Sequence, residues 1–299
     1  MADERKVLEK VNELVNNHCY NAAFKICREY SPQVRGLDSI MADMLDKFRL
    51  TGQGASMLEE KADREKDLAL KEQLAEKAAG LFEKVGWYSQ SIIIYGKLYV
   101  QLGKIEHQLK KEVLHSSLTD HVNSIEKRVN EHIEKYPKHL YEIDPEERIY
   151  DKIQMRAELA EAEKSFGIAC GYYDELAEKA LVKLVRYNQL GAKESEIQRL
   201  SNHLVDAYFR VGDCYVRAGM FGHADHFAIK KLIECKERKI LKYERKDIES
   251  RHEEYKKKYH MIMSEGNIEA FGKKEAPTEV NGEKSEQDKS LDDIIERNF

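Results

Sequence analysis

The residues best suited to chemistry in this chain of 299 residues are two glutamate–histidine pairs with one spacing. Glu112 precedes His115 by three residues, and Glu249 precedes His252 by three. In a helix this spacing puts carboxylate and imidazole on one face, as in carboxylate-bridged di-metal bundles, which also need a glutamate from each of two other helices. No pattern identifies those glutamates. Eleven histidines in a Glu-rich chain give roughly one such pair by chance, which weakens the metal interpretation. A metal-dependent helical-bundle enzyme is therefore only the alternative function.

The remaining reactive-looking residues indicate ordinary structure. His223 and His226 follow the turn glycine Gly219, and they lack an evident third ligand for a metal. The Gly-Gln-Gly stretch at 52–54 has neither a preceding strand nor a following Gly-Lys-Ser/Thr, so we expect an interhelical loop rather than a phosphate-binding loop. No Gly-x-Ser-x-Gly elbow and no protease-like cysteine signature occurs. The sequence therefore predicts no catalytic residue, no resident metal and no cofactor.

The composition predicts an all-α protein of the cytoplasm. Charged residues make up 35% of the chain and prolines number four, which is typical of helix-rich proteins. Five cysteines without a Cys-x-x-Cys pair favour neither a disulfide framework nor a zinc site. The net charge of −5 gives no global positive field for nucleic acid. The N-terminus lacks the apolar core of a signal peptide, and the apolar run at 91–103 is short and contains Lys97, so we expect no membrane insertion.

Apolar residues recur at intervals of three and four, which is the period of packed helix faces. The pattern is clearest at 72–105 and 205–238, where one stripe precedes a turn glycine, Gly86 or Gly219, and a second follows it. The stripe residues are Ala75, Ala78, Ala79, Phe82, Ser91, Tyr95, Leu98, Tyr208, Val211, Gly212, Tyr215, Ala224 and Ala228. Small residues let two antiparallel helices approach closely. A hairpin of about 34 residues cannot bury its face alone, so we expect neighbouring hairpins to stack.

On these residues, segment 205–238 resembles a tetratricopeptide repeat, and segment 72–105 is a fair match with Ser91 where the family usually has Ala. Residues 4–37 match less well because they lack the turn glycine. The regular spacing then fails, and the proline that usually closes a repeat is mostly missing. An irregular array or a related helical-hairpin adaptor fold of the SNAP type is equally compatible. The resemblance implies stacked hairpins whose first helices line a concave groove.

The resemblance also implies which residues face that groove. They are Glu76, Glu83, Asp206, Phe209 and Asp213. An acidic groove favours a basic or amphipathic peptide as its ligand. The Lys/Arg/Asn pattern with which chaperone-binding members hold a C-terminal carboxylate is missing from these positions. We therefore expect a non-enzymatic adaptor or scaffold for protein–protein interaction.

Long charged helices are expected between and after the hairpins. We predict single helices over 55–78 and over 222–263, and the second half of the latter keeps a narrow coiled-coil-like seam. The seam residues are Leu241, Ile248, His252, Tyr255, Tyr259 and Ile262. Pairing of such helices between copies of the chain would give a homo-oligomer. The basic run 256–258 between two tyrosines suggests an RNA-associated scaffold as a third function, but the acidic neighbours Glu253 and Glu254 favour a solvated flank.

Prolines divide the predicted chain into two lobes. Pro137 and Pro145 bracket the best internal boundary. The sequence thus predicts an N-terminal tetratricopeptide-like lobe over 1–136, a linker at 137–145 and a C-terminal lobe over 146–263.

The last 36 residues combine a polar stretch with an apolar end. Residues 264–289 are too poor in apolar side chains to offset the entropy of ordering, so we expect a disordered tether. In the final segment, 290–299, Ser290 and the acids that follow it provide a helix-capping signal. The apolar residues of that helix would be Leu291, Ile294, Ile295 and Phe299. We predict a docking segment, which fits either an external partner or the last hairpin of this chain.

Overall fold

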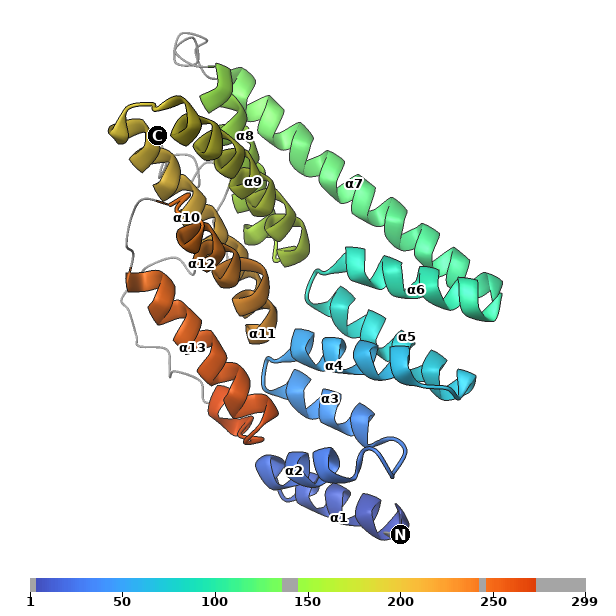
Figure 1. Cartoon of the computed structure of the whole chain (residues 1–299). Coiled ribbons are helices and arrows are strands. Elements are labelled where there is room, and N and C mark those ends of the chain that lie inside the picture. The colour runs from blue at the N-terminus through green and yellow to red at the C-terminus, as the bar shows by residue number, and fades with distance from the viewer. Residues whose placement is uncertain (1–3, 136–144, 242–245, 273–299) are drawn as a thin grey trace, which may run out of the picture. The chain divides into compact units, whose positions relative to one another are not determined.

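The structure is a computed structural model that describes residues 4–135, 145–241 and 246–272 (Figure 1). Every regular element in these ranges is helical, which confirms the predicted all-α class. Within the same ranges, no helix combines the length and apolar character needed to cross a membrane. The predicted docking segment 290–299 lies outside the described residues, as do 273–289 and the linker 137–145 except for Pro145. Those assignments stay predictions.

The described residues form two compact units. Unit 1 contains 4–116, 218–221 and 256–272, and unit 2 contains the remaining described residues. The chain passes between the units within α7 (Ile105–Lys135), within α13 (Lys246–Met263) and on both sides of residues 218–221.

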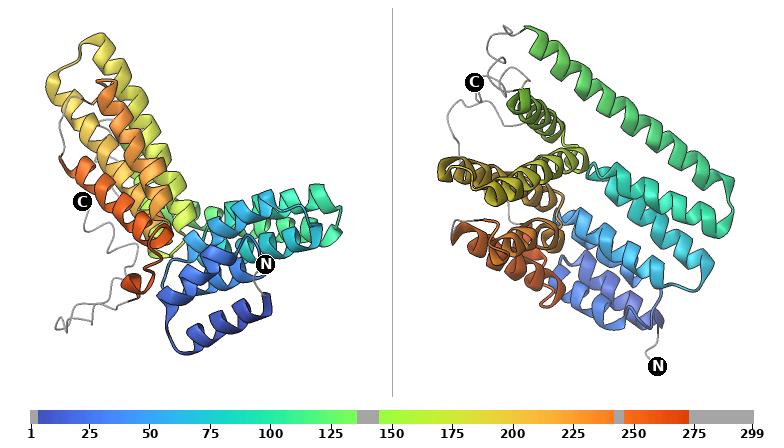
Figure 2. Two further views of the ribbon diagram at one scale, coloured as in Figure 1. Left: turned by 60° about the horizontal axis from the view of Figure 1, so that its bottom comes forward. Right: turned by 45° about the horizontal axis from the view of Figure 1, so that its top comes forward.

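Unit 1 begins with six helices, each packed on the next (Figures 1 and 2). They are α1 (Glu4–Asn16), α2 (Tyr20–Tyr30), α3 (Leu37–Lys47), α4 (Thr51–Arg64), α5 (Leu68–Lys84) and α6 (Tyr88–Leu102). Short turns join them, so neighbouring helices form hairpins, and the first part of α7 follows α6. This series of mutually packed helices is the architecture of a helical-repeat protein.

The hairpin of α5 and α6 has the core that the sequence predicts. All seven of its predicted stripe residues are buried: Ala75, Ala78, Ala79, Phe82, Ser91, Tyr95 and Leu98. Ser91 donates its hydroxyl proton to the Ala79 carbonyl at 2.7 Å, so a polar side chain is satisfied inside the crossing. Gly86 has a φ of 70° in the turn, a conformation that glycine adopts without strain.

The single helix predicted over 55–78 is wrong, because the chain breaks between α4 and α5. The Glu65 carboxylate accepts hydrogen bonds from the backbone N–H groups of Lys66 and Asp67, at 2.8 and 3.0 Å. The Asp67 carboxylate then caps α5 by accepting from Ala69 N and Leu70 N. These backbone bonds lower the pKa of both carboxyls, and they compete with continuation of the helix.

The Gly-Gln-Gly stretch at 52–54 is not a loop, which corrects the prediction. It lies in the first turns of α4 and is buried in unit 1. Gly52 N donates to the Ala218 carbonyl at 2.9 Å, and a Cβ on Gly52 would lie 2.5 Å from that oxygen. A Cβ on Gly219, whose φ is 75°, would lie 2.5 Å from the carbonyl oxygen of Arg49. Both glycines are therefore required by a close approach of two backbones.

Residues 264–272 are folded, although the sequence places them in a disordered tether. The short η3 helix (Glu269–Phe271) lies against the start of α2, and Ile268 is fully buried. Glu269 accepts from Asn21 N at 3.0 Å, and Asn21 Oδ1 accepts from Glu269 N at 3.0 Å. Cys19, the N-cap residue of α2, makes no side-chain cap, so Glu269 satisfies a helix-end donor from a distant part of the chain.

Unit 2 is built around three long helices. The second part of α7 is followed by α8 (Pro145–Ala162), α9 (Phe166–Leu190) and α10 (Glu194–Arg217), and α9 packs on both α8 and α10. After the turn come α11 (Phe221–Ala224), the π-helix η2 (Asp225–Ile229) and α12 (Lys230–Glu237). In this second predicted hairpin Tyr208, Val211, Gly212, Ala224 and Ala228 are buried, whereas Tyr215 is partly exposed.

The continuous helix predicted over 222–263 is also wrong. Lys239 has a φ of 58°, and the N–H groups of Ile240 and Leu241 both return to the Cys235 carbonyl, which ends α12. A separate helix, α13, begins at Lys246.

The predicted seam of α13 is buried within this chain. Ile248, Tyr255 and Ile262, spaced by seven residues, are all buried, whereas Tyr259 is 40% exposed. In unit 2 the Tyr255 ring lies against Gly212 of α10, where a Cβ would be 3.5 Å from the ring. These three seam residues are therefore buried without a helix from a second copy of the chain.

The close approach at Gly52 predicts opposite effects for one substitution at two helical glycines of unit 1. Gly52→Ala should lower the free energy of unfolding by about 1–3 kcal/mol, because its methyl group overlaps Ala218 and Met220. Gly80→Ala, in α5 with no atom within 4 Å, should raise it by about 0.5–1 kcal/mol. Urea denaturation followed by fluorescence of Trp87, the single tryptophan, reports on unit 1. Equal effects at both sites would refute the packing.

Candidate functional site

The candidate site is a cleft in unit 2 of about 560 Å³, bounded by α8, α9, α10 and α13. This volume is in the range of ligand-binding clefts. The lining residues are Tyr150, Asp151, Gln154, Glu158, Tyr173, Leu176, His203, Asp206, Ala207, Phe209, Arg210, Asp213 and Arg251. Four carboxylates and two guanidinium groups give this lining a formal charge of −2 with His203 neutral. Three aromatic side chains add apolar faces.

One face of α10 forms the longest wall of the cleft. Its lining positions recur at intervals of three and four from His203 to Asp213, which is the spacing of one helical face. Ten residues of helix span about 15 Å, so the wall has the length of roughly four or five residues of extended peptide. The same helix α10 also packs on α9 and η2. The wall is therefore held by the core of unit 2.

Arg251 of α13 closes one end of the cleft. Its guanidinium group lies 4.1 Å from the centre of the Phe209 ring, and its Nη1 donates to Asp213 Oδ1 at 2.9 Å. The hydroxyl of Tyr255 lies 3.4 Å from Nη1 and 3.5 Å from Asp213 Oδ1. Burial and the neighbouring Asp213 raise the pKa of Tyr255 to about 12. This end of the cleft thus shows how a cation is held between an aromatic face and a carboxylate.

Two residues of the lining, Tyr173 and Arg210, interact with Glu161. Its carboxylate accepts from the Tyr173 hydroxyl at 2.9 Å and from Arg217 Nη1 at 3.0 Å, and Arg210 Nη1 is 4.0 Å away. Burial raises the pKa of Tyr173 above its ordinary value. Burial by itself lowers the pKa of Arg210, but Tyr173 and the carboxylates of Glu161, Glu158 and Asp213 raise it overall. Arg210 therefore remains charged.

The groove residues implied by the repeat resemblance fall into two groups. Asp206, Phe209 and Asp213 line the cleft of unit 2. Glu76 and Glu83 lie on α5 in unit 1, where Glu76 pairs with Lys110 of α7 at 2.7 Å. Burial raises the pKa of Glu83, while the nearby Lys110 opposes that shift. That a peptide binds at any of these positions stays a prediction.

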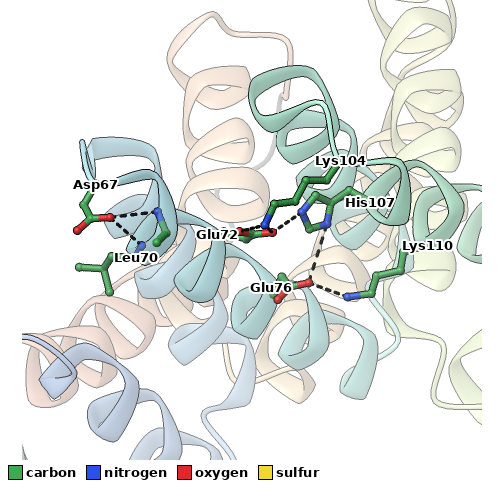
Figure 3. Close-up of polar contacts among 8 residues, drawn as sticks. Asp67, Leu70, Glu72, Glu76, Lys104, His107 and Lys110 are labelled. Atoms are coloured by element: carbon green, nitrogen blue, oxygen red, sulfur yellow. Dashed lines mark hydrogen bonds and ion pairs between the residues drawn. The ribbon is translucent and has the colours of Figure 1, made fainter.

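A second polar cluster, in unit 1, surrounds His107 (Figure 3). The ring is fully buried, with Nε2 2.8 Å from Glu72 Oε1, and it stacks on Tyr95. Lys104 also donates to Glu72, and this hydrogen bond lowers the pKa of Glu72. His107 Nδ1 lies 3.9 Å from Glu76, too far for a hydrogen bond. The cluster fastens the start of α7 to α5 and gives unit 1 a structural ion-pair network.

The two Glu-x-x-His pairs lie in different units. Glu112 and His115 are exposed on α7 in unit 1, and Gln108 donates to Glu112. In unit 2, Glu249 pairs with Lys236 at 2.6 Å, and His252 Nδ1 contacts the buried Asp225. Across the described part of the chain, no group of three or more His, Cys, Asp or Glu is placed to hold a metal.

The side chains of the other candidate chemistries are engaged in packing. His223 is packed beside Tyr215 and Phe227. Burial lowers the pKa of His223, and the nearby His226 lowers it further. Tyr255, which an RNA-binding role would use for stacking, is buried. The five cysteines are free, and burial raises the pKa of Cys27 and Cys170 to about 12.

Sequence reasoning missed the α8 wall and Arg251. Tyr150, Gln154 and Glu158 recur every four residues, a periodicity that places them on one helical face. That signal was available, but polar residues at such spacing normally indicate a solvated face. Arg251 stands in a charged run, and only the packing of α13 on α10 brings it to Phe209.

The ion-pair network around His107 predicts a pH-dependent stability effect. Because the folded-state pKa of Glu72 is lowered, its contribution is present above the ordinary value of 4.5 and is lost as the pH falls through the lower folded value. Glu72→Gln should destabilise unit 1 by about 1 kcal/mol at pH 7, and this deficit should shrink below pH 4.5. Urea denaturation followed by Trp87 fluorescence at several pH values measures it. Glu29→Gln, an exposed carboxylate of α2 in unit 1, is the control, and a deficit independent of pH would contradict the assignment.

Comparison with known proteins adds no identity to this geometry. No model of a protein family, no curated protein and no solved structure matches the chain. The resemblance to tetratricopeptide repeats is therefore carried by the residues of the hairpins alone.

Proposed function

We propose that this protein is a non-enzymatic adaptor that binds a basic segment of a partner protein in the cleft of unit 2. The observation that carries the proposal is the lining of that cleft, in which α10 and α8 each contribute two carboxylates and one phenylalanine or tyrosine ring. The finer description of the fold as a tetratricopeptide-like hairpin array, and a cytoplasmic location suited to five free cysteines, belong to the same proposal.

The chemistry of the lining selects for cations. With a formal charge of −2, the cleft attracts positively charged side chains and repels acidic ones. Asp206 is exposed on the wall, whereas Phe209 is buried at its base, so a bound cation meets carboxylates near the solvent and an apolar face below. A partner peptide with alternating basic and apolar residues matches both features.

The C-terminal segment supplies the second half of the proposed adaptor. Residues 290–299 carry the predicted docking residues, and residues 273–289 join them to the end of the described chain in unit 1. A tether of 17 residues, as the sequence predicts here, would span about 23 Å on average and would raise the effective concentration of a partner bound at its end. We propose that this segment captures a separate partner.

Charge neutralisation on the wall should weaken peptide binding selectively. The probe is a labelled octapeptide of alternating arginine and leucine, measured by fluorescence polarisation. Asp206→Asn should weaken binding by about five- to tenfold, because it removes one carboxylate from the cleft. Glu196→Gln, an exposed carboxylate on α10 outside the lining, should leave the affinity unchanged. Failure of the wild-type chain to bind, or equal effects of both substitutions, would reject the proposed function.

Removal of the C-terminal segment should separate its two roles. A chain that ends at Ser290 should lose a partner that the full-length protein captures from native lysate, as read by mass spectrometry. If the segment instead covers the chain's own helices, the partner list will be unchanged and the melting temperature will fall. Replacement of Leu291, Ile294, Ile295 and Phe299 by serine removes the same apolar side chains without shortening the chain, so it separates the effect of these side chains from the effect of length.

A further inference from the structure

We propose that the cleft recognises guanidinium groups in particular, and that Arg251 is a built-in competitor which an arginine of the partner displaces. This inference rests on the proposed function, because it names the ligand chemistry and the regulation of the same cleft. It follows from the position of Arg251, which is one of two guanidinium groups in the lining and is the one that lies over Phe209 and beside Asp213.

The contacts of Arg251 define the recognition chemistry. Its guanidinium group lies over the Phe209 ring at 4.1 Å from the centre while Nη1 donates to Asp213 at 2.9 Å. A planar guanidinium group can stack on a ring and donate sideways at the same time. A lysine ammonium group has no plane to stack and is more strongly hydrated, so it satisfies this pair of groups less well.

The position of the Arg251 guanidinium group between the Phe209 ring and the Asp213 carboxylate is called the seat. Arg251 can leave this seat while α13 stays packed on α10. The side chains of Arg251 and Asp213 are 32% and 38% exposed, so water is at hand to solvate both groups during exchange. An ion pair this exposed, together with one cation–π contact, contributes only a few-fold each to an equilibrium constant. Meanwhile α13 is also held by the buried Ile248, by the Tyr255 ring against Gly212 and by the contact of His252 with Asp225.

Displacement by a partner is an exchange of like for like. The incoming guanidinium group takes the ring and the carboxylate, and Arg251 moves to solvent, so the cleft gains no net contact at that seat. The partner must therefore bring further basic groups, and these meet the carboxylates along the wall, among them Asp151 and Asp206. Arg251 thus raises the threshold for binding and favours peptides with several arginines over those with one.

The test compares two labelled octapeptides, arginine–alanine and lysine–alanine repeats, on the full-length protein. We expect the wild-type chain to bind the arginine peptide about fivefold more tightly or better. Arg251→Gln empties the seat and changes the formal charge of the lining from −2 to −3, so the arginine peptide should bind about five- to thirtyfold more tightly. Arg251→Lys should lie between the wild type and Arg251→Gln, because it keeps the charge and loses the stacking.

The control for the seat is Phe209→Leu in the Arg251→Gln background. This pair keeps an apolar side chain at the buried position and removes the ring, so it should abolish the preference for arginine over lysine. Far-ultraviolet circular dichroism confirms the fold of each variant, and Arg251→Lys provides the decision if Arg251→Gln does not fold.

The outcomes separate the two proposals. If the wild-type chain binds neither peptide, the proposed function fails and this inference fails with it. If the peptides bind but arginine is not preferred, or neither substitution of Arg251 tightens binding, the competitor role is overturned while the basic-peptide adaptor stands.

Discussion

The close approach between the first turn of α4 and the turn at 218–221 is the constraint on which unit 1 depends. Two backbones come near enough for Gly52 N to donate to the Ala218 carbonyl, and neither Gly52 nor Gly219 has room for a side chain. Through this contact, a turn that follows α10 in the sequence becomes part of the N-terminal helical stack. Phe271 of the last described turn packs beside Phe221 of the same turn, so three stretches of chain meet there. The unit is thus defined by tertiary contact rather than by a continuous segment.

The helix α10 plays the corresponding role in unit 2. Its apolar face packs on α9 and η2, and its polar face forms a wall of the cleft. Residues of the wall stand within one or two positions of buried core residues, for instance Asp206 two positions after Leu204 and Phe209 next to Tyr208. A binding surface built on such a helix is fixed by core packing and needs no ordered loop. The ligand preference of the proposed binding surface could then change through a few surface residues while the fold stays the same.

Local periodicity explains what the sequence could predict. The stripes of α5 and α6, and those of α10 and the segment after it, are regular enough to show which residues are buried, and most of them are. The breaks were harder to foresee, because Glu65 and Asp67 resemble any charged pair on a helix until their carboxylates accept backbone N–H groups. The cleft was half predictable for the same reason: the α10 residues follow from periodicity, whereas Arg251 and the α8 wall depend on which helices become neighbours.

The contact of Glu269 with Asn21 has a consequence for the synthesis of the protein. The N-terminal hairpin emerges first from the ribosome, yet one of its backbone donors at the start of α2 is satisfied by a residue 248 positions later. Ile268, which is fully buried in unit 1, belongs to the same late part of the chain. Unit 1 therefore cannot reach its final state during translation of its first six helices, and it must wait, partly exposed, while all of unit 2 is made. Contacts of such long sequence separation slow folding, and the surface that they cover stays exposed in the nascent chain until residue 272 is released.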